Sequence, residues 1–382
     1  MHKIRLINKI AEVGLKRLDP ARFSVGENEP DPAGMLVRSA KITELPDSLL
    51  AIARAGAGVN NIPVSECAEK GIVVFNTPGA NANAVRELAV CALFLSSRDI
   101  VGGVEWARTL EDDVPARVEK GKSQFAGPEI MGKTLGVIGL GAIGVGVANA
   151  GHHLGMSVVG YDPYISVDAA WGLSRSVRHC HDLKQMLPEC DYISLHAPLN
   201  PKTRGMFNAE MFALMKDGVR ILNFARAELV ENADLLSALD GGKVAKYVTD
   251  FPNGTVHKNI LPIPHLGAST PESEDNCAVM AVDELKDYLL NGNIRNSVNF
   301  PDVTLPPCDK CFRLCVIHKN IPNMIAAITA FFGERGINTE DLVSKSNGEY
   351  QYTVLNVTSI GSGTAEKLMA VDGIIKVRVL KN

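Results

Sequence analysis

The sequence predicts an α/β protein in which a Rossmann-type domain is inserted in a flavodoxin-like domain and followed by a small ferredoxin-like domain. Three observations lead to this prediction. A glycine-rich turn beyond residue 130 is followed by alternating strands and helices, a shorter alternation of the same kind precedes it, and a β-α-β-β-α-β pattern ends the chain. The expected parts are residues 1–90 with 271–300, residues 91–270, a linker over 301–311, and residues 312–382.

Composition narrows the classes of protein that remain. The chain has 382 residues and a formal net charge of −4, without a basic stripe, so non-specific binding to nucleic acid is not expected. No apolar run reaches about 18 residues and no signal-peptide core follows Met1, which predicts a cytoplasmic protein without membrane contact. The pair Cys308-x-x-Cys311 lacks a second ligand pair at zinc spacing, so no metal site is predicted.

Short apolar strands alternate with helical stretches in the first 90 residues, which is typical of a doubly wound unit. These strands are expected at residues 4–8, 35–38, 50–54 and 72–76. An apolar helix over 82–97 leads out of the unit, and a polar stretch over 105–124 precedes the glycine-rich turn. The apolar residues 85–95 suit either the core of the monomer or a symmetric dimer interface.

The glycine-rich turn predicts a dinucleotide site. An apolar strand runs into Gly139-x-Gly141-x-x-Gly144, which opens a helix, and a second apolar strand ends at Asp162. The first glycine permits a tight turn, the second lets the backbone approach a pyrophosphate, and the third lets helix and strand pack closely. Asp162 suits the ribose hydroxyls and would repel a 2′-phosphate, so the expected cofactor is NAD. The competing interpretation is a glycine-rich turn in an ordinary α/β domain.

A parallel sheet is expected to continue after this motif, with further strands at residues 192–196, 219–223, 244–250 and 260–263. Thr270 is a plausible N-cap, with Pro271 at the first position of a helix that ends near Gly292. The prolines of residues 299–307 indicate a linker. The ferredoxin-like pattern then predicts strands at 312–318, 342–347, 350–358 and 374–380, with helices at 323–334 and 364–371.

Polar residues at strand ends are the candidates for chemistry, because open α/β sheets bind ligands beyond the carboxyl ends of their strands. Arg226 could clamp a carboxylate, and His265 is rigidly placed between a proline and a glycine-rich turn, as a proton donor must be. Arg38 and Arg54 could bind an anionic substrate group. Each of the four, taken alone, is equally compatible with a surface or structural role.

These motifs together resemble the D-isomer-specific 2-hydroxyacid dehydrogenases. The resemblance rests on the glycine motif with Asp162, on Asn-x-Ala-Arg226, on Pro-His265-x-Gly-Ala-Ser-Thr, on Arg54-Ala-Gly-x-Gly-Val, and on Asn76-Thr-Pro-Gly. The C-terminal Ile-His318-Lys-Asn320-Ile-Pro, with Gly-Ile-Asn338, resembles an ACT regulatory domain.

The resemblance assigns residues to roles. Arg226 would hold the substrate carboxylate and His265 would take the hydroxyl proton, which makes these two the expected catalytic residues. The substrate phosphate and its loop would be met by Arg38, Arg54, Gly56 and Asn76. L-serine would bind at the ACT positions His318, Asn320 and Asn338. The NAD site would be formed by Gly139, Gly141, Ala142, Ile143, Gly144, Asp162, Pro198, Thr203, Phe224, Ala225, Asp250, Gly267 and Ala268.

The chain departs from the family pattern at three positions. The family's catalytic glutamate usually follows the segment that reads Asp250-Phe-Pro-Asn-Gly here, but this chain has no carboxylate at that place. His265 is therefore expected to act without an acidic partner or to have Asp250 as its partner. Glu228 stands where relatives usually carry glycine. Asn323 replaces a usual glycine of the ACT motif, so inhibition by serine is not assumed.

The resemblance implies an NAD-dependent enzyme that oxidises D-3-phosphoglycerate to 3-phosphohydroxypyruvate, the first step of L-serine biosynthesis, and that forms a homodimer or higher homo-oligomer. Two alternatives remain open. One is a dehydrogenase of another D-2-hydroxy acid such as 2-hydroxyglutarate. The other is a non-catalytic sensor of NAD and amino acids.

Overall fold

The computed structural model describes residues 1–307 and 311–381, which fall into two compact units. The first comprises Met1–Asn81 and Pro271–Asn382, and the second Ala82–Thr270. The division lies at 81/82 rather than after residue 90 because helix α3 (Ala82–Ser97) belongs wholly to the second unit, where Ala89 and Leu93 pack with Leu135 and Val137. Cys308, in the middle of the expected linker, lies outside the described residues.

The first unit contains a five-stranded parallel sheet in the order β2-β1-β3-β4-β5. This order is that of flavodoxin-like folds and confirms the predicted class. The short strand β2 was not expected from the sequence. The strands are β1 (His2–Leu6), β2 (Phe23–Gly26), β3 (Gly34–Val37), β4 (Ala51–Arg54) and β5 (Val73–Phe75), and the helices are α1 (Glu12–Leu15), α2 (Val64–Glu69) and α11 (Pro271–Asn291).

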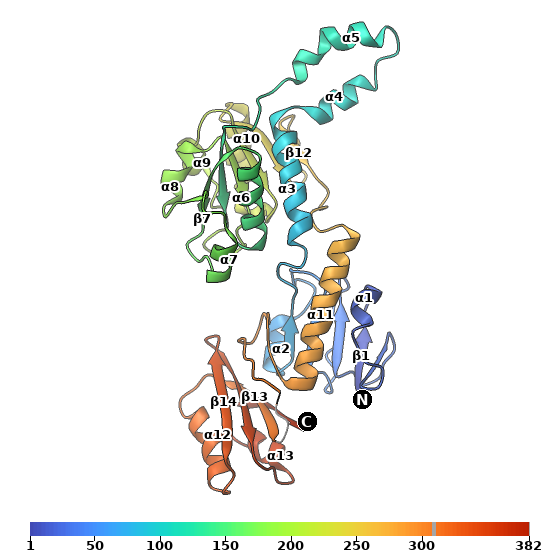
Figure 1. Ribbon diagram of the computed structural model, residues 1–382, viewed down its shortest axis with the longest axis vertical. Coiled ribbons are helices and arrows are strands. Elements are labelled where there is room, and N and C mark those ends of the chain that lie inside the picture. The colour runs from blue at the N-terminus through green and yellow to red at the C-terminus, as the bar shows by residue number, and fades with distance from the viewer. Residues whose placement is uncertain (308–310, 382) are drawn as a thin grey trace. The chain divides into compact units, whose positions relative to one another are not determined.

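Helix α11 returns to this unit after the inserted segment, as the sequence predicts (Figure 1). Its apolar residues enter the same core as β1 and β4, with Ala281 and Leu285 completely buried. The helix begins at Pro271, a residue whose fixed φ suits the first turn, and it ends just before Gly292, which has a φ of +70°.

The C-terminal residues of the first unit form a four-stranded antiparallel sheet in the order β14-β15-β13-β16. This order and the two intervening helices define a ferredoxin-like arrangement, as predicted. The elements are β13 (Phe312–Lys319), α12 (Met324–Gly333), β14 (Thr339–Ser346), β15 (Tyr350–Val357), α13 (Thr364–Met369) and β16 (Ile374–Lys381).

Three side chains of this sheet satisfy the last carbonyl groups of α11. Arg378 donates to the carbonyl oxygens of residues 288 and 289 at 3.2 and 3.1 Å, and Arg313 donates to that of Asn291 at 2.9 Å. The hydroxyl of Tyr352 donates to the carbonyl of Gly292 at 2.6 Å. Because the last carbonyls of a helix have no partner within it, these bonds fasten the antiparallel sheet to α11.

The second unit contains a seven-stranded parallel sheet in the order β12-β11-β10-β9-β6-β7-β8. The order reverses between β6 and β9, which is the switch point of a Rossmann-type sheet. The strands are β6 (Thr134–Ile138), β7 (Ser157–Tyr161), β8 (Arg178–His179), β9 (Tyr192–Leu195), β10 (Val219–Asn223), β11 (Val244–Thr249) and β12 (Ile260–Pro262). The covering helices are α6 (Ala142–His153), α7 (Val167–Gly172), α8 (Leu183–Met186), α9 (Ala209–Leu214) and α10 (Asn232–Asp240), with 3₁₀ turns at Leu187–Glu189 and Ala227–Leu229.

The polar stretch expected over 105–124 is largely helical. Helices α4 (Ile100–Ala107) and α5 (Val114–Gly121) form a hairpin that Figure 1 draws away from the seven-stranded sheet, and a 3₁₀ turn (Lys122–Phe125) follows. Trp106 and Phe125 hold the hairpin together, with ring centroids 5.3 Å apart. Neither helix has a buried residue, so their apolar side chains remain uncovered.

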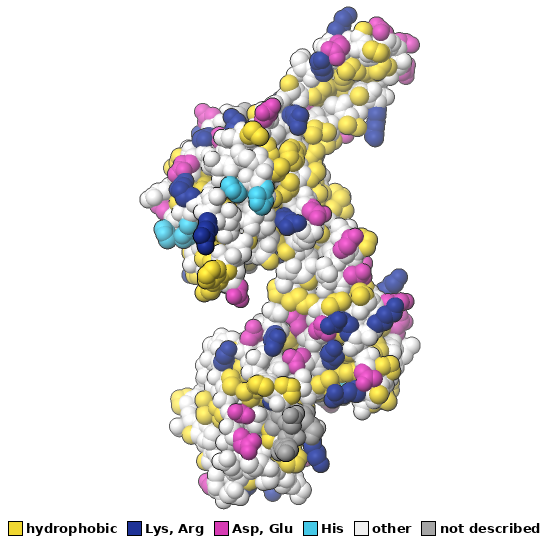
Figure 2. All heavy atoms as spheres, viewed as in Figure 1, with side chains coloured by type: hydrophobic (Ala, Val, Ile, Leu, Met, Phe, Trp, Pro, Cys, Tyr) yellow, Lys and Arg dark blue, Asp and Glu magenta, His cyan; other side chains and the backbone are white. Residues whose placement is uncertain are grey.

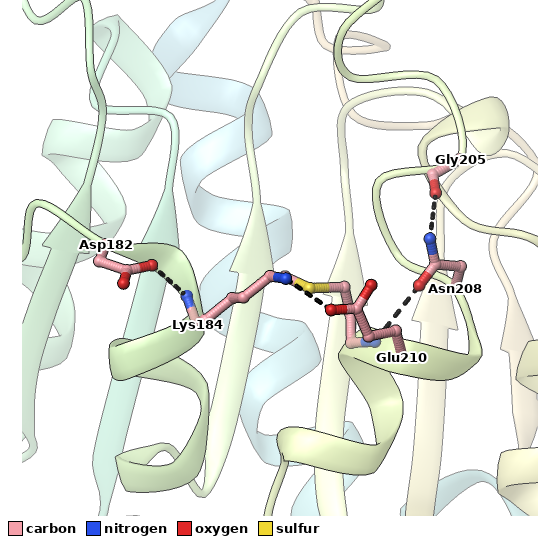
Figure 3. Close-up of polar contacts among 6 residues, drawn as sticks. Asp182, Lys184, Gly205, Asn208 and Glu210 are labelled. Carbon is pink, nitrogen blue, oxygen red and sulfur yellow. Dashed lines mark hydrogen bonds and ion pairs between the residues drawn. The ribbon is translucent and has the colours of Figure 1, made fainter.

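Two short helices on this unit begin at side-chain caps (Figure 3). Asp182 accepts a hydrogen bond from the backbone N–H of Lys184 at 2.9 Å, and Asn208 accepts one from that of Met211 at 3.3 Å. The ammonium of Lys184 pairs with Glu210 at 2.5 Å and so joins α8 to α9.

Over residues 1–307 and 311–381, no helix combines the length and apolar character needed to cross a membrane.

Candidate active site

The glycine-rich turn joins β6 to α6, and its three glycines meet three different demands. Gly139 has a φ of +88°. A Cβ on Gly144 would lie 1.8 Å from the carbonyl oxygen of Gly139, whereas a Cβ on Gly141 would have no neighbour within 4 Å. Helix α6 begins with Ala142 and Ile143, and its N-cap residue, Gly141, has no side chain that could accept from its first amides. This cradle fits the pyrophosphate of a dinucleotide.

Asp162 stands at the end of β7, beside the turn. Its carboxylate accepts hydrogen bonds from the N–H groups of Leu140 and Tyr164, each at 2.8 Å. The acid therefore fixes the glycine-rich turn against the neighbouring strand. It also puts a negative charge next to the turn, where the ribose of an NAD-type cofactor would lie.

The end of β9 forms the other side of the switch point. A Cβ on Gly139 would lie 2.6 Å from the amide nitrogen of Ala197, so the two strand ends approach closely. The Nε2 atom of His196 bonds to the hydroxyl of Ser194 at 2.8 Å, and its buried Nδ1 has no partner among the described residues. Burial lowers the pKa of His196 to about 3, so the ring is neutral at physiological pH. In the following loop, Thr203 donates to the carbonyl of Pro198 at 2.6 Å.

The end of β10 is shaped by the buried side chain of Asn223. Its Oδ1 accepts from the N–H of Ala225 at 3.1 Å, and its Nδ2 donates to the carbonyl of Arg226 at 2.9 Å. The turn therefore buries Phe224 and Ala225 while Arg226 is exposed at the strand end. The Arg226 guanidinium donates to the carbonyl of Ala225 at 2.6 Å, which limits its freedom to swing.

Asp250, at the end of β11, organises the loop that carries His265. Asp250 is only 2% exposed, and its two oxygens accept from the N–H groups of Leu266 and Gly267 at 2.7 and 2.8 Å. Burial raises the pKa of Asp250, whereas the two amides and the nearby His265 act to lower it. His265 itself has a φ of +53°, a strained backbone for a residue with a side chain.

The aromatic ring of Phe251 lies against both predicted catalytic residues. The centroid of its ring is 4.9 Å from that of His265, and the Arg226 guanidinium carbon is 5.7 Å from it. Arg226 and His265 therefore share one aromatic neighbour, although they are far apart in the chain. Phe251 was not predicted as a site residue from the sequence. The segment Asp250-Phe-Pro was singled out there because the family's catalytic glutamate is missing after it. The signal that could have identified Phe251 is its position, as an aromatic residue directly after the acid at the end of a strand.

The hypothesis that His265 leans on Asp250 takes a different form in the structure. Both oxygens of Asp250 are engaged by backbone amides next to His265, so the acid fixes the position of the loop that carries the imidazole. The segment after Phe251 turns away toward α10, where Asn232 donates to the hydroxyl of Thr255 at 2.6 Å. Exposed Glu228 lies in the 3₁₀ turn after Arg226.

The substrate residues predicted in the first unit lie at the carboxyl ends of β3, β4 and β5. Arg54 donates from Nε to the carbonyl of Arg38 at 2.9 Å, and Arg38 pairs with Glu274 at 2.6 Å. Asn76 donates from Nδ2 to the carbonyl of Ala57 at 2.6 Å. These side chains thus border the loop of residues 55–60, in which Gly56 has a φ of +153°.

The three residues expected to bind L-serine lie at the two ends of the antiparallel sheet. His318 is completely buried near the end of β13, with Nδ1 bonded to the carbonyl of Lys319 and Nε2 to the hydroxyl of Thr353, each at 2.9 Å. Asn320 follows it and donates to the carbonyl of Gly348 at 2.9 Å. Asn338 lies at the opposite end of the sheet, where its carbonyl accepts from Thr358.

The fold and the strand-end residues of the second unit define a dinucleotide-binding domain of the dehydrogenase type. A family model described as "D-isomer specific 2-hydroxyacid dehydrogenase, NAD binding domain" matches residues 95–267. The D-3-phosphoglycerate dehydrogenase of Haemophilus influenzae is 31% identical over 359 residues, which cover 90% of this chain and 84% of that protein. The chain belongs to the D-isomer-specific 2-hydroxyacid dehydrogenase family.

Other relatives share only part of their length with this chain. The human D-3-phosphoglycerate dehydrogenase is 37% identical over 284 residues, which cover 69% of this chain and 50% of the human protein. The chain therefore spans about half the length of that relative. The solved structure of an NAD⁺-bound 3-phosphoglycerate dehydrogenase from Entamoeba histolytica superimposes on this chain with a TM-score of 0.61 and is 28% identical in sequence. The superposition covers 78% of this chain and 98% of that chain.

Proposed function

We propose that this protein catalyses the NAD-dependent oxidation of D-3-phosphoglycerate to 3-phosphohydroxypyruvate, the first step of L-serine biosynthesis. The observation that carries the proposal is the shared contact of Arg226 and His265 with Phe251, at the edge of the sheet that holds the glycine-rich turn. The names of two relatives with 37% and 31% identity support this substrate, since both are D-3-phosphoglycerate dehydrogenases.

The proposed chemistry removes a hydride from the carbon that bears the hydroxyl group and a proton from the hydroxyl oxygen. NAD, when bound, accepts the hydride. The imidazole of His265 would accept the hydroxyl proton, and Arg226 would hold the substrate carboxylate through two parallel hydrogen bonds. The charge of buried Asp250 would stabilise the imidazolium that forms, and the amides held by Asp250 would keep the ring in place.

The phosphate group is the feature that separates this substrate from 2-hydroxyglutarate. We assign it to Arg54 and Arg38, with Gly56 and Asn76 shaping the loop beside them. The carboxylate of Glu274 already pairs with Arg38, and the phosphate would compete for the same guanidinium. Replacement of Arg54 tests this assignment.

We also propose that the protein forms a homo-oligomer. Helix α3 offers little support, because Val85, Ala89 and Leu93 are buried in the core of the second unit. The support comes from the α4–α5 hairpin, where Ile100 is 42% and Val104 is 45% exposed. Figure 2 shows hydrophobic side chains gathered over this hairpin. A monomer in sedimentation analysis would contradict this proposal.

Regulation by L-serine at the C-terminal sheet is proposed in a restricted form. Buried His318 offers no free ring nitrogen, so L-serine would be bound by either Asn320 or Asn338, which lie at opposite ends of the sheet. A serine titration of the dehydrogenase rate tests this directly.

The proposed activity is tested by mixing the purified protein with NAD and each candidate substrate and measuring the absorbance of the NADH that forms. We expect turnover of D-3-phosphoglycerate and much slower turnover of 2-hydroxyglutarate. Replacing Arg54 by methionine should lower kcat/KM for phosphoglycerate on the order of a hundredfold, because a charge-assisted bond is worth about 1.5–3 kcal/mol. Equal loss with 2-hydroxyglutarate would contradict the assignment of Arg54 to the phosphate.

A further inference from the structure

Glu284, in the middle of helix α11, is a buried acid without a charged partner among the described residues. The residue is 9% exposed. Its Oε1 atom accepts a hydrogen bond from the side-chain amide of Asn296 at 2.7 Å, and its Oε2 atom has no hydrogen-bond partner in the described part of the chain. An uncompensated buried polar atom costs free energy, so its retention calls for an explanation.

Asn296 connects this acid to strand β5. Its backbone has a φ of +56°, and its carbonyl oxygen accepts from the N–H of Asn76 at 3.5 Å. The residues that follow run alongside β5: the N–H of Val298 donates to the carbonyl of Val74 at 2.9 Å, and the N–H of Val74 donates to the side chain of Asn299 at 2.9 Å. The segment of residues 296–299 therefore lies alongside the end of β5 and fixes the position of Asn76.

Asn76 in turn holds the loop of residues 55–60. Its side chain donates to the carbonyl of Ala57 at 2.6 Å, and the N–H of its neighbour Thr77 donates to the carbonyl of Gly56 at 3.2 Å. A continuous series of hydrogen bonds thus leads from Glu284 through Asn296 and Asn76 to this loop, entirely within the first unit.

We infer that Glu284 is a positioning residue, which holds Asn296 and through it fixes Asn76 and the 55–60 loop in the conformation that binds substrate. The inference rests on the proposed function, in which this loop meets the phosphoglycerate. Glu284 contacts neither substrate nor cofactor in this account. Its effect is expected on substrate affinity and not on the hydride step.

The protonation state of Glu284 makes this series of hydrogen bonds sensitive to pH. The pKa of Glu284 is raised to about 8, chiefly by burial; the Asn296 amide acts to lower it, and the charges of Asp302 on the returning segment and of Asp283 on α11 act to raise it. Asp283 is itself paired with Arg17 at 2.7 Å. At neutral pH the side chain is therefore a neutral acid, and above about pH 8 a buried negative charge forms beside two other carboxylates.

Steady-state kinetics with phosphoglycerate test the inference through the separation of KM from kcat. We expect E284A to raise KM for phosphoglycerate about tenfold, the effect of one lost hydrogen bond, with kcat and the KM for NAD little changed. E284Q, which copies the neutral acid, should restore KM at pH 7 and should lack the rise of KM that the unaltered protein shows as the pH passes about 8. The matched control is D275N, an exposed acid on the same helix, which should change none of these values.

Amide hydrogen exchange gives a readout that does not depend on the substrate. Residues 55–60 and Asn76 should exchange faster in E284A, but not in E284Q or D275N. Unchanged exchange in E284A, or a KM equal to that of the unaltered protein, overturns the inference. Faster exchange in a protein that does not oxidise phosphoglycerate supports the positioning role and refutes only the proposed function.

Discussion

The ring of Phe251 lies against the imidazole of His265, with centroids 4.9 Å apart and planes inclined by 52°. The same ring is approached by the guanidinium of Arg226 at 5.7 Å. A residue without a functional group of its own thereby holds the relative position of the two residues to which we assign proton transfer and carboxylate binding. Catalysis depends on such positions, because small displacements of reacting groups cost large factors in rate.

Replacing Phe251 by alanine should lower kcat/KM about ten- to a hundredfold, since both side chains lose the surface that orients them. Binding of NAD, measured by calorimetry, should change little, because the glycine-rich turn is untouched. Phe251→Tyr keeps the ring and should retain most activity. Full activity of the alanine variant would show that the arrangement of Arg226 and His265 does not depend on the ring.

The glycine-rich turn allows a matched pair of substitutions. Gly141 has a φ of −77° and space for a Cβ, so Gly141→Ala should fold with normal thermal stability but bind NAD at least about tenfold more weakly, because the methyl group takes the place of the pyrophosphate. Gly144→Ala should lose about 1–3 kcal/mol of stability, because its Cβ would overlap the carbonyl oxygen of Gly139. Thermal unfolding and NAD titration of both variants check the pair, and tight NAD binding by Gly141→Ala would contradict the placement of the pyrophosphate.

Much of the fold could be predicted from the sequence because its signals are local. The apolar strand before Gly139, the helix after it and Asp162 at the next strand end are set by residues close in the chain, and both sheet orders follow from regular alternation. Strands β2 and β8 escaped prediction because they are short edge strands. The helices within residues 105–124 were not predicted, because α4 and α5 carry no buried face.

The residues that could not be predicted act through contacts between distant parts of the chain. Nothing local links Phe251 to Arg226 or Asn296 to Asn76. The first contact arises from neighbouring strands, and the second arises from the returning segment that also bonds to Glu284. For His318, Asn320 and Asn338 the family pattern suggests a role but not a position in space. Strand pairing puts the first and last of them at opposite ends of the antiparallel sheet.

The contacts of α8 and α9 predict that a helix-capping hydrogen bond contributes more to the stability of the protein than an exposed ion pair does. Asn208→Ala removes the acceptor for the N–H of Met211 and should destabilise the protein by about 1 kcal/mol. Lys184→Ala breaks the pair with Glu210, whose side chains are more than half exposed, and should cost about 0.5 kcal/mol or less. Denaturant unfolding of both variants measures the difference; a larger loss for Lys184→Ala would reverse this ranking.

Transfer of the C2 hydrogen tests the central claim most directly. D-3-phosphoglycerate labelled with deuterium at C2 is incubated with NAD and the protein, and the reduced cofactor is analysed by mass spectrometry. We expect deuterium in the reduced cofactor, and a transfer rate lowered at least about a hundredfold in His265→Gln, because a positioned acid–base group contributes at least that much. Failure of the unaltered protein to transfer deuterium, or an undiminished rate in His265→Gln, would contradict the account.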